Sequence, residues 1–289
     1  MASDPTLDAA LRGDVRSIGR VLTSIEDRTD VGRERFSELY RRSGRAATVG
    51  VTGAPGAGKS TLVSALVSHL RSDDGTLAIV AVDPSSPFTG GAILGDRVRM
   101  GDHAGDDRVF IRSVANRGSL GGISETTPSI VAALDGLGHD EIVVETVGIG
   151  QSEVEIASTA DTTVVVVPAG WGDAVQASKA GFLEVADVLI VNKADRADAA
   201  RTVADLENMI ALGPPTGWTP PVIATVATEG RGVEDLASVI LSHRAHLADT
   251  DAGTTRSRMQ AARQLAAAIR YEVDASASSV VHDDVVASI

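Results

Sequence analysis

The sequence predicts an α/β fold, a doubly wound and mostly parallel sheet with helical extensions at both ends. Two observations support this. Apolar, β-branched runs alternate along the chain with segments whose apolar residues recur at helical spacing, which is typical of a parallel sheet covered by helices. The first of these runs, Ala47 to Val51, leads through a glycine-rich turn into a helical pattern, so the fold begins with a strand, a loop and a helix.

The remaining elements follow in the same alternation. The expected strands are Ala47–Val51, Leu77–Val82, Arg108–Ser113, Glu141–Glu145, Thr162–Val167, Val188–Val191 and Val222–Val226. The expected helices between and after them are Thr61–Arg71, Thr126–Leu137, Gln151–Ala157, Ala174–Ala186, Ala197–Leu212 and Val233–Leu247. We divide the chain into an N-terminal helical extension (1–45), a central domain (46–247) and a C-terminal helical arm (248–289). In the extension, the spacing predicts one helix over Thr6–Asp27 and a second over Arg33–Arg42.

The turn after the first strand carries the pattern G-x-x-x-x-G-K-[ST], with Gly53, Gly58, Lys59 and Ser60 at its fixed positions. Glycines allow backbone N–H groups to close around phosphate oxygens, the lysine reaches the β- and γ-phosphates, and the hydroxyl binds Mg²⁺. The sequence therefore predicts a P-loop that binds a nucleoside triphosphate. Its expected nucleotide contacts are Gly53, Ala54, Pro55, Gly56, Ala57, Gly58, Lys59, Ser60 and Thr61.

The base is indicated by residues that follow later strands. Asn192, Lys193 and Asp195 form an N-K-x-D motif directly after an apolar strand. A carboxylate at Asp195 can accept hydrogen bonds from guanine N1–H and the 2-amino group, whereas adenine offers neither donor there. We therefore expect GTP and GDP as ligands. The next strand ends at Val226, Ala227 and Thr228, whose backbone N–H groups are expected near the guanine oxygen.

Two carboxylates, Asp83 and Glu145, come directly after predicted core strands. Mg²⁺ prefers carboxylates, retained waters and phosphate oxygens, so we expect Ser60, Asp83 and Glu145 to serve the metal. Lys59, Asp83 and Glu145 are the expected catalytic residues. Gly148 completes a carboxylate-x-x-Gly pattern whose N–H can sense the γ-phosphate. A helix N-cap or a loop salt bridge is the alternative role for each carboxylate.

No residue compels the role of an arginine finger. Arg97, Arg99, Arg112 and Arg117 lie in or near predicted loops, where an arginine is more often a surface charge. Intrinsic turnover is therefore expected to be slow, below ~10⁻¹ s⁻¹, and open to acceleration by a partner.

Composition limits the partners. The formal net charge of −13 opposes binding to nucleic acid or to an anionic membrane. The sequence holds no cysteine, which excludes disulfides and thiolate metal sites. It shows neither a membrane-spanning run nor a secretory signal at its start, so we expect a cytoplasmic protein.

Several motifs together resemble one family. The P-loop GAPGAGKST, the segments Ala81–Met100, Ile111–Gly122, Glu145–Glu153 and Gly172–Asp187, and NKAD resemble, in this order, the MeaB/MMAA/ArgK-type GTPases of the SIMIBI class. The resemblance implies slow GTP hydrolysis and a chaperone role toward an adenosylcobalamin-dependent methylmalonyl-CoA mutase or a related acyl-CoA mutase. It also implies a third switch at Asp173, Gln176 and Lys179 that responds to the mutase. Relatives often dimerise through a longer C-terminal arm, so residues 248–289 are a candidate homodimer contact. Val226-Ala-Thr departs from the family's usual Ser-Ala pair.

Two other function classes remain open. A SIMIBI metallochaperone GTPase would use cysteine and clustered histidine for its cargo, and this chain has no cysteine and scattered histidines. A small-molecule kinase or ATPase, such as the proteins described as amino-acid-transport kinases, would gain nothing from a guanine-selective N-K-A-D motif.

Overall fold

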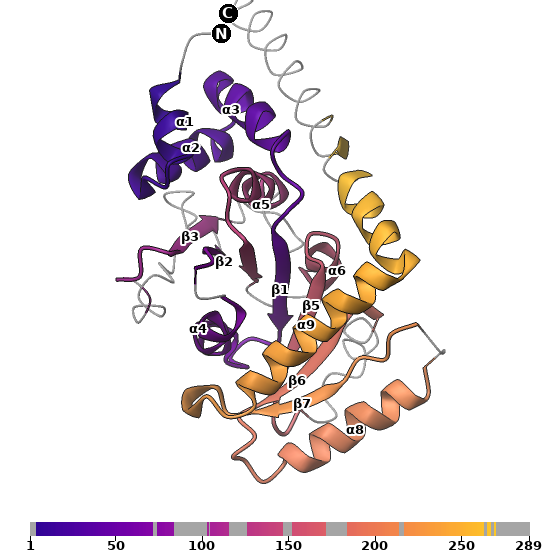
Figure 1. Cartoon of the computed structure of the whole chain (residues 1–289). Helices are drawn as coiled ribbons and strands as arrows, with labels where there is room; N and C mark the ends of the chain where they lie inside the picture. The colour runs from indigo at the N-terminus through magenta and orange to yellow at the C-terminus, as the bar shows by residue number, and fades with distance from the viewer. Residues whose placement is uncertain are drawn as a thin grey trace, which may run out of the picture.

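The computed structural model describes residues 4–71, 74–83, 103, 105–115, 126–146, 152–171, 184–213, 217–262, 265, 266 and 269. At its centre is a seven-stranded sheet with the order β3-β2-β4-β1-β5-β6-β7 (Figure 1). All six pairings between neighbouring strands are parallel, which confirms the predicted fold class. The strands are β1 (Ala47–Gly53), β2 (Leu77–Asp83), β3 (Val109–Ala115), β4 (Glu141–Glu145), β5 (Thr162–Pro168), β6 (Val188–Asn192) and β7 (Val222–Thr225).

Helices cover both faces of the sheet. They are α1 (Pro5–Ala10), α2 (Val15–Glu26), α3 (Asp30–Tyr40), α4 (Lys59–Leu70), α5 (Thr127–Gly136), α6 (Ser152–Ala157), α8 (Ala199–Ala211) and α9 (Val233–Asp249), with a 3₁₀ turn at Ala227–Glu229. The predicted helix over 174–186 lies mostly outside the described residues, and only Glu184 and Val185 of it are seen as helical.

Alternation along the strands divides the core into two layers, because successive side chains point to opposite faces. Val49 and Val51 of β1 pack with α4 and α9 on one face. The opposite face of β2 and β4 packs with α5 and with the N-terminal helices, and α8 covers β5 and β6 on that same face. The N-terminal helices therefore share a hydrophobic core with the sheet.

The strand order reverses around β1, since the chain moves from β1 to β2 on one side and later fills β5, β6 and β7 on the other. In doubly wound sheets, ligands bind at this reversal, outside the carboxyl ends of the strands. In Figure 1, α4 begins at the carboxyl end of β1, at the opposite end from the three N-terminal helices. The topology therefore directs attention to the β1–α4 loop.

The N-terminal extension differs from the single helix predicted over Thr6–Asp27. The chain forms α1 and α2 instead, separated by a turn at residues 11–14. Asp14 ends the turn as the N-cap of α2, and its carboxylate accepts from the N–H of Ser17 at 2.8 Å. Apolar spacing continues across the break because both helices bury their apolar side in the same cluster, so the periodicity alone does not reveal it.

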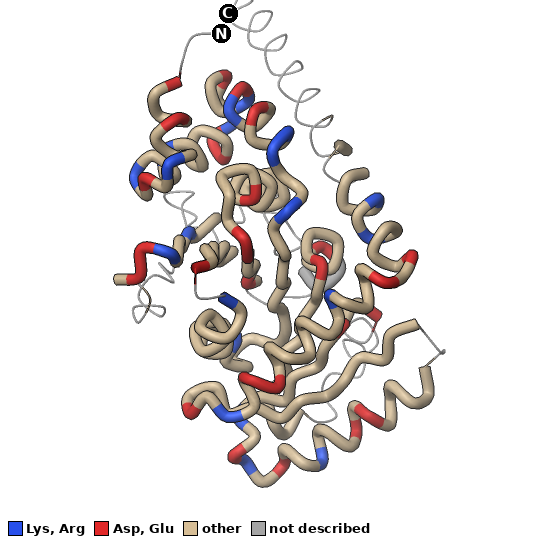
Figure 2. Tube along the Cα trace, viewed as in Figure 1, with Lys and Arg blue, Asp and Glu red and all other residues tan. Residues whose placement is uncertain are grey.

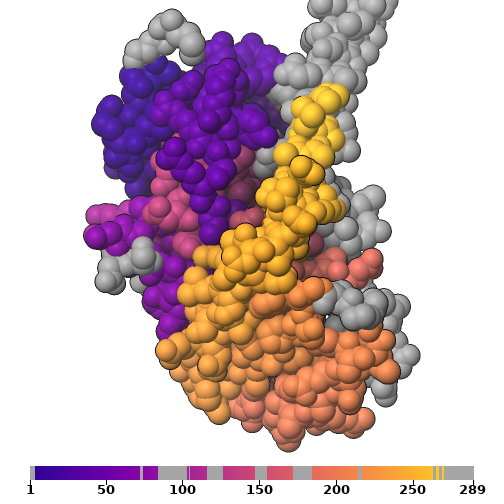
Figure 3. All heavy atoms as spheres, turned by 45° about the vertical axis from the view of Figure 1, so that its right-hand side comes forward, coloured from indigo at the N-terminus to yellow at the C-terminus, as the bar shows by residue number. Residues whose placement is uncertain are grey.

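A second helical segment, residues 251–262, follows α9 after a break at Thr250, whose backbone is extended. In Figure 3 these residues, in yellow, continue along the surface from α9. Acidic and basic residues are interleaved along α3 in Figure 2, and near its end Arg42 forms an ion pair with Glu38 at 2.8 Å. Within the described ranges, no helix has both the length and the apolar character needed to cross a membrane.

Candidate functional site

The loop between β1 and α4 approaches its neighbours so closely that it requires glycine. A Cβ on Gly53 would lie 1.9 Å from the backbone oxygen of Val166 in β5. The N–H of Ala54 donates to that same oxygen at 3.2 Å, which holds the start of the loop against the sheet. The first glycine of the motif therefore allows the loop to begin inside the sheet, at the point of strand reversal.

The loop ends at the N-terminus of α4. Gly58 is the N-cap, with a φ of +91°, and within the described part of the chain no side chain caps this end of the helix. The first N–H groups of a helix lack intrahelical partners and carry partial positive charge. Such an end is suited to phosphate oxygens.

Lys59 is buried, with 7% of its surface exposed, and its ammonium group folds back over the loop. Nζ donates to the backbone oxygens of Gly53 at 3.0 Å and Ala54 at 3.1 Å. These contacts hold a positive charge at the mouth of the glycine-rich loop, where a terminal phosphate would be neutralised.

The hydroxyl of Ser60 donates to Glu145 Oε1 at 2.6 Å, which brings together two residues that the sequence assigned to one metal site. Asp83 ends β2, and two residues before it Ala81 is in register with Glu145 in β4. Asp83 and Glu145 are 2% and 5% exposed. Both carboxylates thus lie at the carboxyl ends of adjacent strands, and a nearby cation would favour their charged forms. A hydroxyl with carboxylates is a hard-oxygen donor set that fits Mg²⁺.

The N-K-x-D motif lies beside the P-loop. Asn192 is 2% exposed; its Nδ2 donates to Ala57 O at 2.8 Å, and its Oδ1 accepts from Thr225 Oγ1 at 3.1 Å and from Ala227 N at 3.2 Å. These three hydrogen bonds join the P-loop to the ends of β6 and β7. Asn192 therefore holds the P-loop against the ends of β6 and β7.

Lys193 has a φ of +61°, unusual for a residue with a side chain, and its Nζ donates to Gly56 O at 2.7 Å. Asp195 follows at the exposed rim of the site. The chain around it is fixed, because Ala194 N donates to Thr225 O at 3.0 Å. The Asp195 carboxylate is therefore accessible from solvent.

The residues expected near the guanine oxygen follow β7. Val226 and Ala227 are 4% and 7% exposed, whereas Thr228 is exposed. Ala227 N already donates to Asn192, so its role in this structure is to hold the loop.

Several expected residues lie outside the described residues. They are Gly148, Asp173, Gln176, Lys179, Arg97, Arg99 and Arg117. The remaining arginine, Arg112 in β3, points to the N-terminal helices, where it donates to Glu26 at 2.5 Å and to Gly19 O at 3.3 Å. Arg112 is thus committed to joining α2 to the sheet.

Sequence reasoning missed three polar residues at the site, Thr52, Thr146 and Thr225. All are buried at strand ends, and their signal in the sequence was a hydroxyl in an otherwise apolar strand context.

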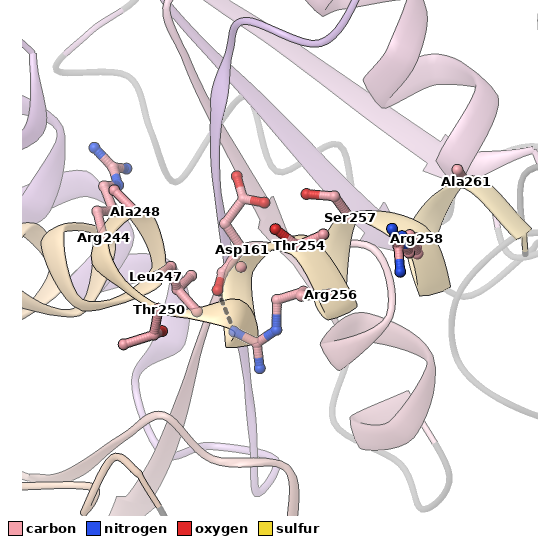
Figure 4. A pocket seen from close by; sticks show the side chains of 11 residues that line it. Asp161, Arg244, Leu247, Ala248, Thr250, Thr254, Arg256, Ser257, Arg258 and Ala261 are labelled. Carbon is pink, nitrogen blue, oxygen red and sulfur yellow. Dashed lines mark hydrogen bonds between the residues drawn. The ribbon is translucent and has the colours of Figure 1, made fainter.

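A cavity of about 630 Å³ lies elsewhere, between α9 and residues 250–261 (Figure 4). Asp161 on its wall precedes β5, so the cavity is at the amino edge of the parallel sheet, opposite the P-loop. Two of the arginines that line it are paired: Arg244 donates two hydrogen bonds to Glu141, and Arg256 donates two to Asp187. We therefore place the functional site at the P-loop, on chemistry rather than on cavity size.

Comparison with known proteins gives a family match and several relatives. Residues 18–281 match the family described as "Methylmalonyl Co-A mutase-associated GTPase MeaB". GTPase ArgK of Escherichia coli is 35% identical over 278 residues, covering 91% of this chain and 82% of that protein. A protein of Pyrococcus abyssi named as a GTPase is 45% identical over 248 residues, covering 84% and 76%. The mitochondrial methylmalonic aciduria type A homolog of Mus musculus is 37% identical over 210 residues, covering 70% and 50%.

Solved structures agree on the fold. The crystal structure of an LAO/AO transport system kinase aligns with a TM-score of 0.70 at 25% identity, covering 98% of this chain and 87% of that one. HypB from Helicobacter pylori, crystallised in complex with nickel, aligns with a TM-score of 0.52 at 18% identity over 74% and 95%. The second likeness concerns the fold alone.

Proposed function

Because this chain belongs to the MeaB family of methylmalonyl-CoA mutase-associated GTPases, we propose that its GTPase cycle serves a cobalamin-dependent acyl-CoA mutase, gating cofactor loading and protecting that enzyme. The GTPase activity itself follows from family membership. The observation that carries the proposal is the family match over residues 18–281, to which the name of the mouse relative adds support.

In the proposed site, GTP lies along the carboxyl edge of the sheet. The N-terminus of α4 and Lys59 bind the phosphates, and Asp195 accepts hydrogen bonds from the guanine. Support comes from the short distances that join these parts: Lys59 to Gly53 O at 3.0 Å, and Asn192 to Ala57 O at 2.8 Å. The parts are held before the nucleotide arrives, which lowers the cost of ordering them.

Phosphoryl transfer to water depends mainly on positioning and on neutralising negative charge. Lys59 supplies charge at the terminal phosphates, and Ser60, Asp83 and Glu145 would hold Mg²⁺. When bound, the ion neutralises charge on the β- and γ-phosphates. Arg112 already donates a hydrogen bond to Glu26, so we do not assign it the role of an arginine finger. We infer slow turnover without a partner.

The mutase role is tested by co-purifying the chain with candidate acyl-CoA mutases and measuring GTP hydrolysis alone and in the complex. We expect a mutase-dependent rise in kcat for the wild type. Lys59→Ala should show none, because it lacks the charge at the phosphates. Arg201→Ala, which removes an exposed cation on α8, is the matched control and should behave as the wild type.

A rate that no mutase changes, with no co-purification, would overturn the chaperone role while leaving the GTPase assignment intact. Transfer of the γ-phosphate to an amino acid in place of water would replace it with a kinase activity, the class of reaction for which the LAO/AO transport system kinase is named.

A further inference from the structure

Two threonine hydroxyls meet inside the sheet just below the P-loop. Thr146 Oγ1 donates to Thr52 Oγ1 at 2.9 Å. Thr52 is fully buried and Thr146 is 1% exposed, so water does not compete for this hydrogen bond. In such an environment the loss of one hydroxyl leaves the other without a hydrogen-bond partner, which costs free energy.

The pair lies where β4 separates from β1. The strand pairing ends with Val51 opposite Glu145, and Thr146 N then donates to Val51 O at 3.0 Å. The hydrogen bond between Thr146 and Thr52 joins the two backbone segments one residue beyond the last strand pair. It is thus the last described link between β1 and the chain that leaves β4.

The residues on either side of this link belong to the GTPase site. Thr52 precedes Gly53, whose backbone oxygen accepts from Lys59 Nζ. Thr146 follows Glu145, whose Oε1 accepts from Ser60. A shift of Thr146 relative to Thr52 would therefore move the Glu145 carboxylate relative to the phosphate loop.

We propose that Thr52 and Thr146 are positioning residues for GTP hydrolysis: their hydroxyl pair sets the placement of Glu145 against Ser60 and the P-loop. The inference rests on the proposed role of Glu145 at the metal. It assigns no contact with GTP to either threonine. A misplacement of about 1 Å at a reacting centre can lower kcat about a hundredfold, so a contact this close to Glu145 is kinetically relevant.

Burial of a threonine hydroxyl does not by itself require a partner in this protein. Thr163 in β5 is also fully buried, and its Oγ1 has no hydrogen-bond partner among the described residues. Thr163→Val therefore replaces a buried hydroxyl by a methyl group of similar size without breaking a described side-chain hydrogen bond. It is the matched control for the same change at Thr146.

The experiment measures kcat and KM for GTP, and the Mg²⁺ concentration for half-maximal rate, in the full chain. For Thr146→Val we expect kcat to fall about tenfold with KM for GTP within about twofold, and more Mg²⁺ to be needed. Thr146→Ser, which keeps the hydroxyl, should restore kcat. Thr163→Val should match the wild type. Thr52→Val removes the same bond from the other side and should reproduce Thr146→Val, which provides a second test if one variant does not fold.

The double variant Thr52→Val/Thr146→Val should lose no more kcat than either single variant, because the same bond is broken once. Wild-type kcat in folded Thr146→Val or Thr52→Val would overturn the inference, as would an equal loss in Thr163→Val or a failure of Thr146→Ser to restore the rate. Glu145→Gln distinguishes the proposed role of Glu145 from that of the threonine pair. If neither Glu145→Gln nor the threonine variants lower kcat, the role of Glu145 is wrong. If Glu145→Gln lowers kcat and the threonine variants do not, only the role of the threonine pair is wrong.

Discussion

Asn192 at the end of β6 is hydrogen-bonded to Ala57 in the P-loop, with 2.8 Å between Nδ2 and the backbone oxygen. The same side chain accepts from Thr225 and Ala227 at the end of β7. The P-loop and the loops that follow β6 and β7 are thus joined through one side chain. A substitution at Asn192 should therefore affect both the P-loop and the loops that follow β6 and β7.

Asn192→Ala should lower the free energy of unfolding by about 1–3 kcal/mol, because it leaves buried groups without partners. Affinity for GTP and for GDP should fall by the same factor, since the loops around the shared base and β-phosphate loosen together. Denaturant titration and nucleotide titration measure the two effects. Asn208→Ala, at an exposed position on α8, should change neither. Loss of GTP affinity alone would contradict this role for Asn192.

Gly58→Ala should damage the site in two separable ways. A Cβ there would lie 2.5 Å from Asn192 Nδ2, and the φ of +91° is itself unfavourable by roughly 1–2 kcal/mol for a residue with a Cβ. Gly56→Ala has only the second penalty, since its φ is +71° and no atom would lie within 4 Å of the Cβ. We expect the larger loss of stability and nucleotide affinity for Gly58→Ala.

The steric conflict between a Cβ at position 58 and Asn192 can be tested by removing the Asn192 side chain. In an Asn192→Ala background the steric conflict disappears, so adding Gly58→Ala should cost less than it does in the wild type. Unfolding free energies of the four proteins give the coupling. Additivity within about 0.5 kcal/mol would show that the two residues do not conflict.

The sequence was sufficient for those features that depend on local chemistry. The strand positions agree with the structure to within two residues, because buried parallel strands appear as continuous apolar runs that end at glycine, proline or a charge. The P-loop was predictable because its glycines are needed for backbone reasons, as the contact of Gly53 with Val166 shows.

Features that depend on residues far apart in the chain were not predictable. The bonds of Asn192 require residues 57, 192 and 225 to meet, and an N-K-x-D pattern does not reveal which of its members face the protein. Likewise, Arg112 lies near the end of a predicted strand, and nothing in the sequence pairs it with Glu26, which the packing of α2 places beside it. The turn before Asp14 was hidden because both flanking helices bury apolar residues in one cluster.

Asp195→Asn should change base preference. The carboxylate is at the exposed rim of the site, where it can accept two hydrogen bonds from guanine, and an amide cannot accept both. GTP affinity should fall by roughly 10²-fold or more, while xanthosine triphosphate should gain affinity because its C2 oxygen accepts from the new amide. Competitive nucleotide titration measures both. Asp198→Asn, three residues further on and also exposed, should retain the preference for GTP.

Acidification should destabilise the protein through His243. Burial lowers the pKa of His243 below its ordinary value of 6.5, although Asp187 at 3.3 Å and Asp161 act in the opposite direction, while Arg256 and His246 add to the lowering. The folded state therefore prefers the neutral ring, whose Nδ1 is paired with Thr162 Oγ1 at 2.9 Å. The stabilisation is complete above the unfolded pKa near 6.5 and is lost as the pH falls toward the lower folded pKa.

His139 provides an independent second case in a separate cluster, because burial also lowers its pKa while Leu134 O accepts a hydrogen bond from it at 3.0 Å. Urea denaturation between about pH 7.5 and pH 5 should show the unfolding free energy of the wild type falling with pH. His243→Gln and His139→Gln should each reduce the slope, and their double variant should reduce it by the sum, since the two sites share no partner among the residues that the structure describes. An unchanged slope in both single variants would mean that the two rings are protonated as readily in the folded chain as in the unfolded one.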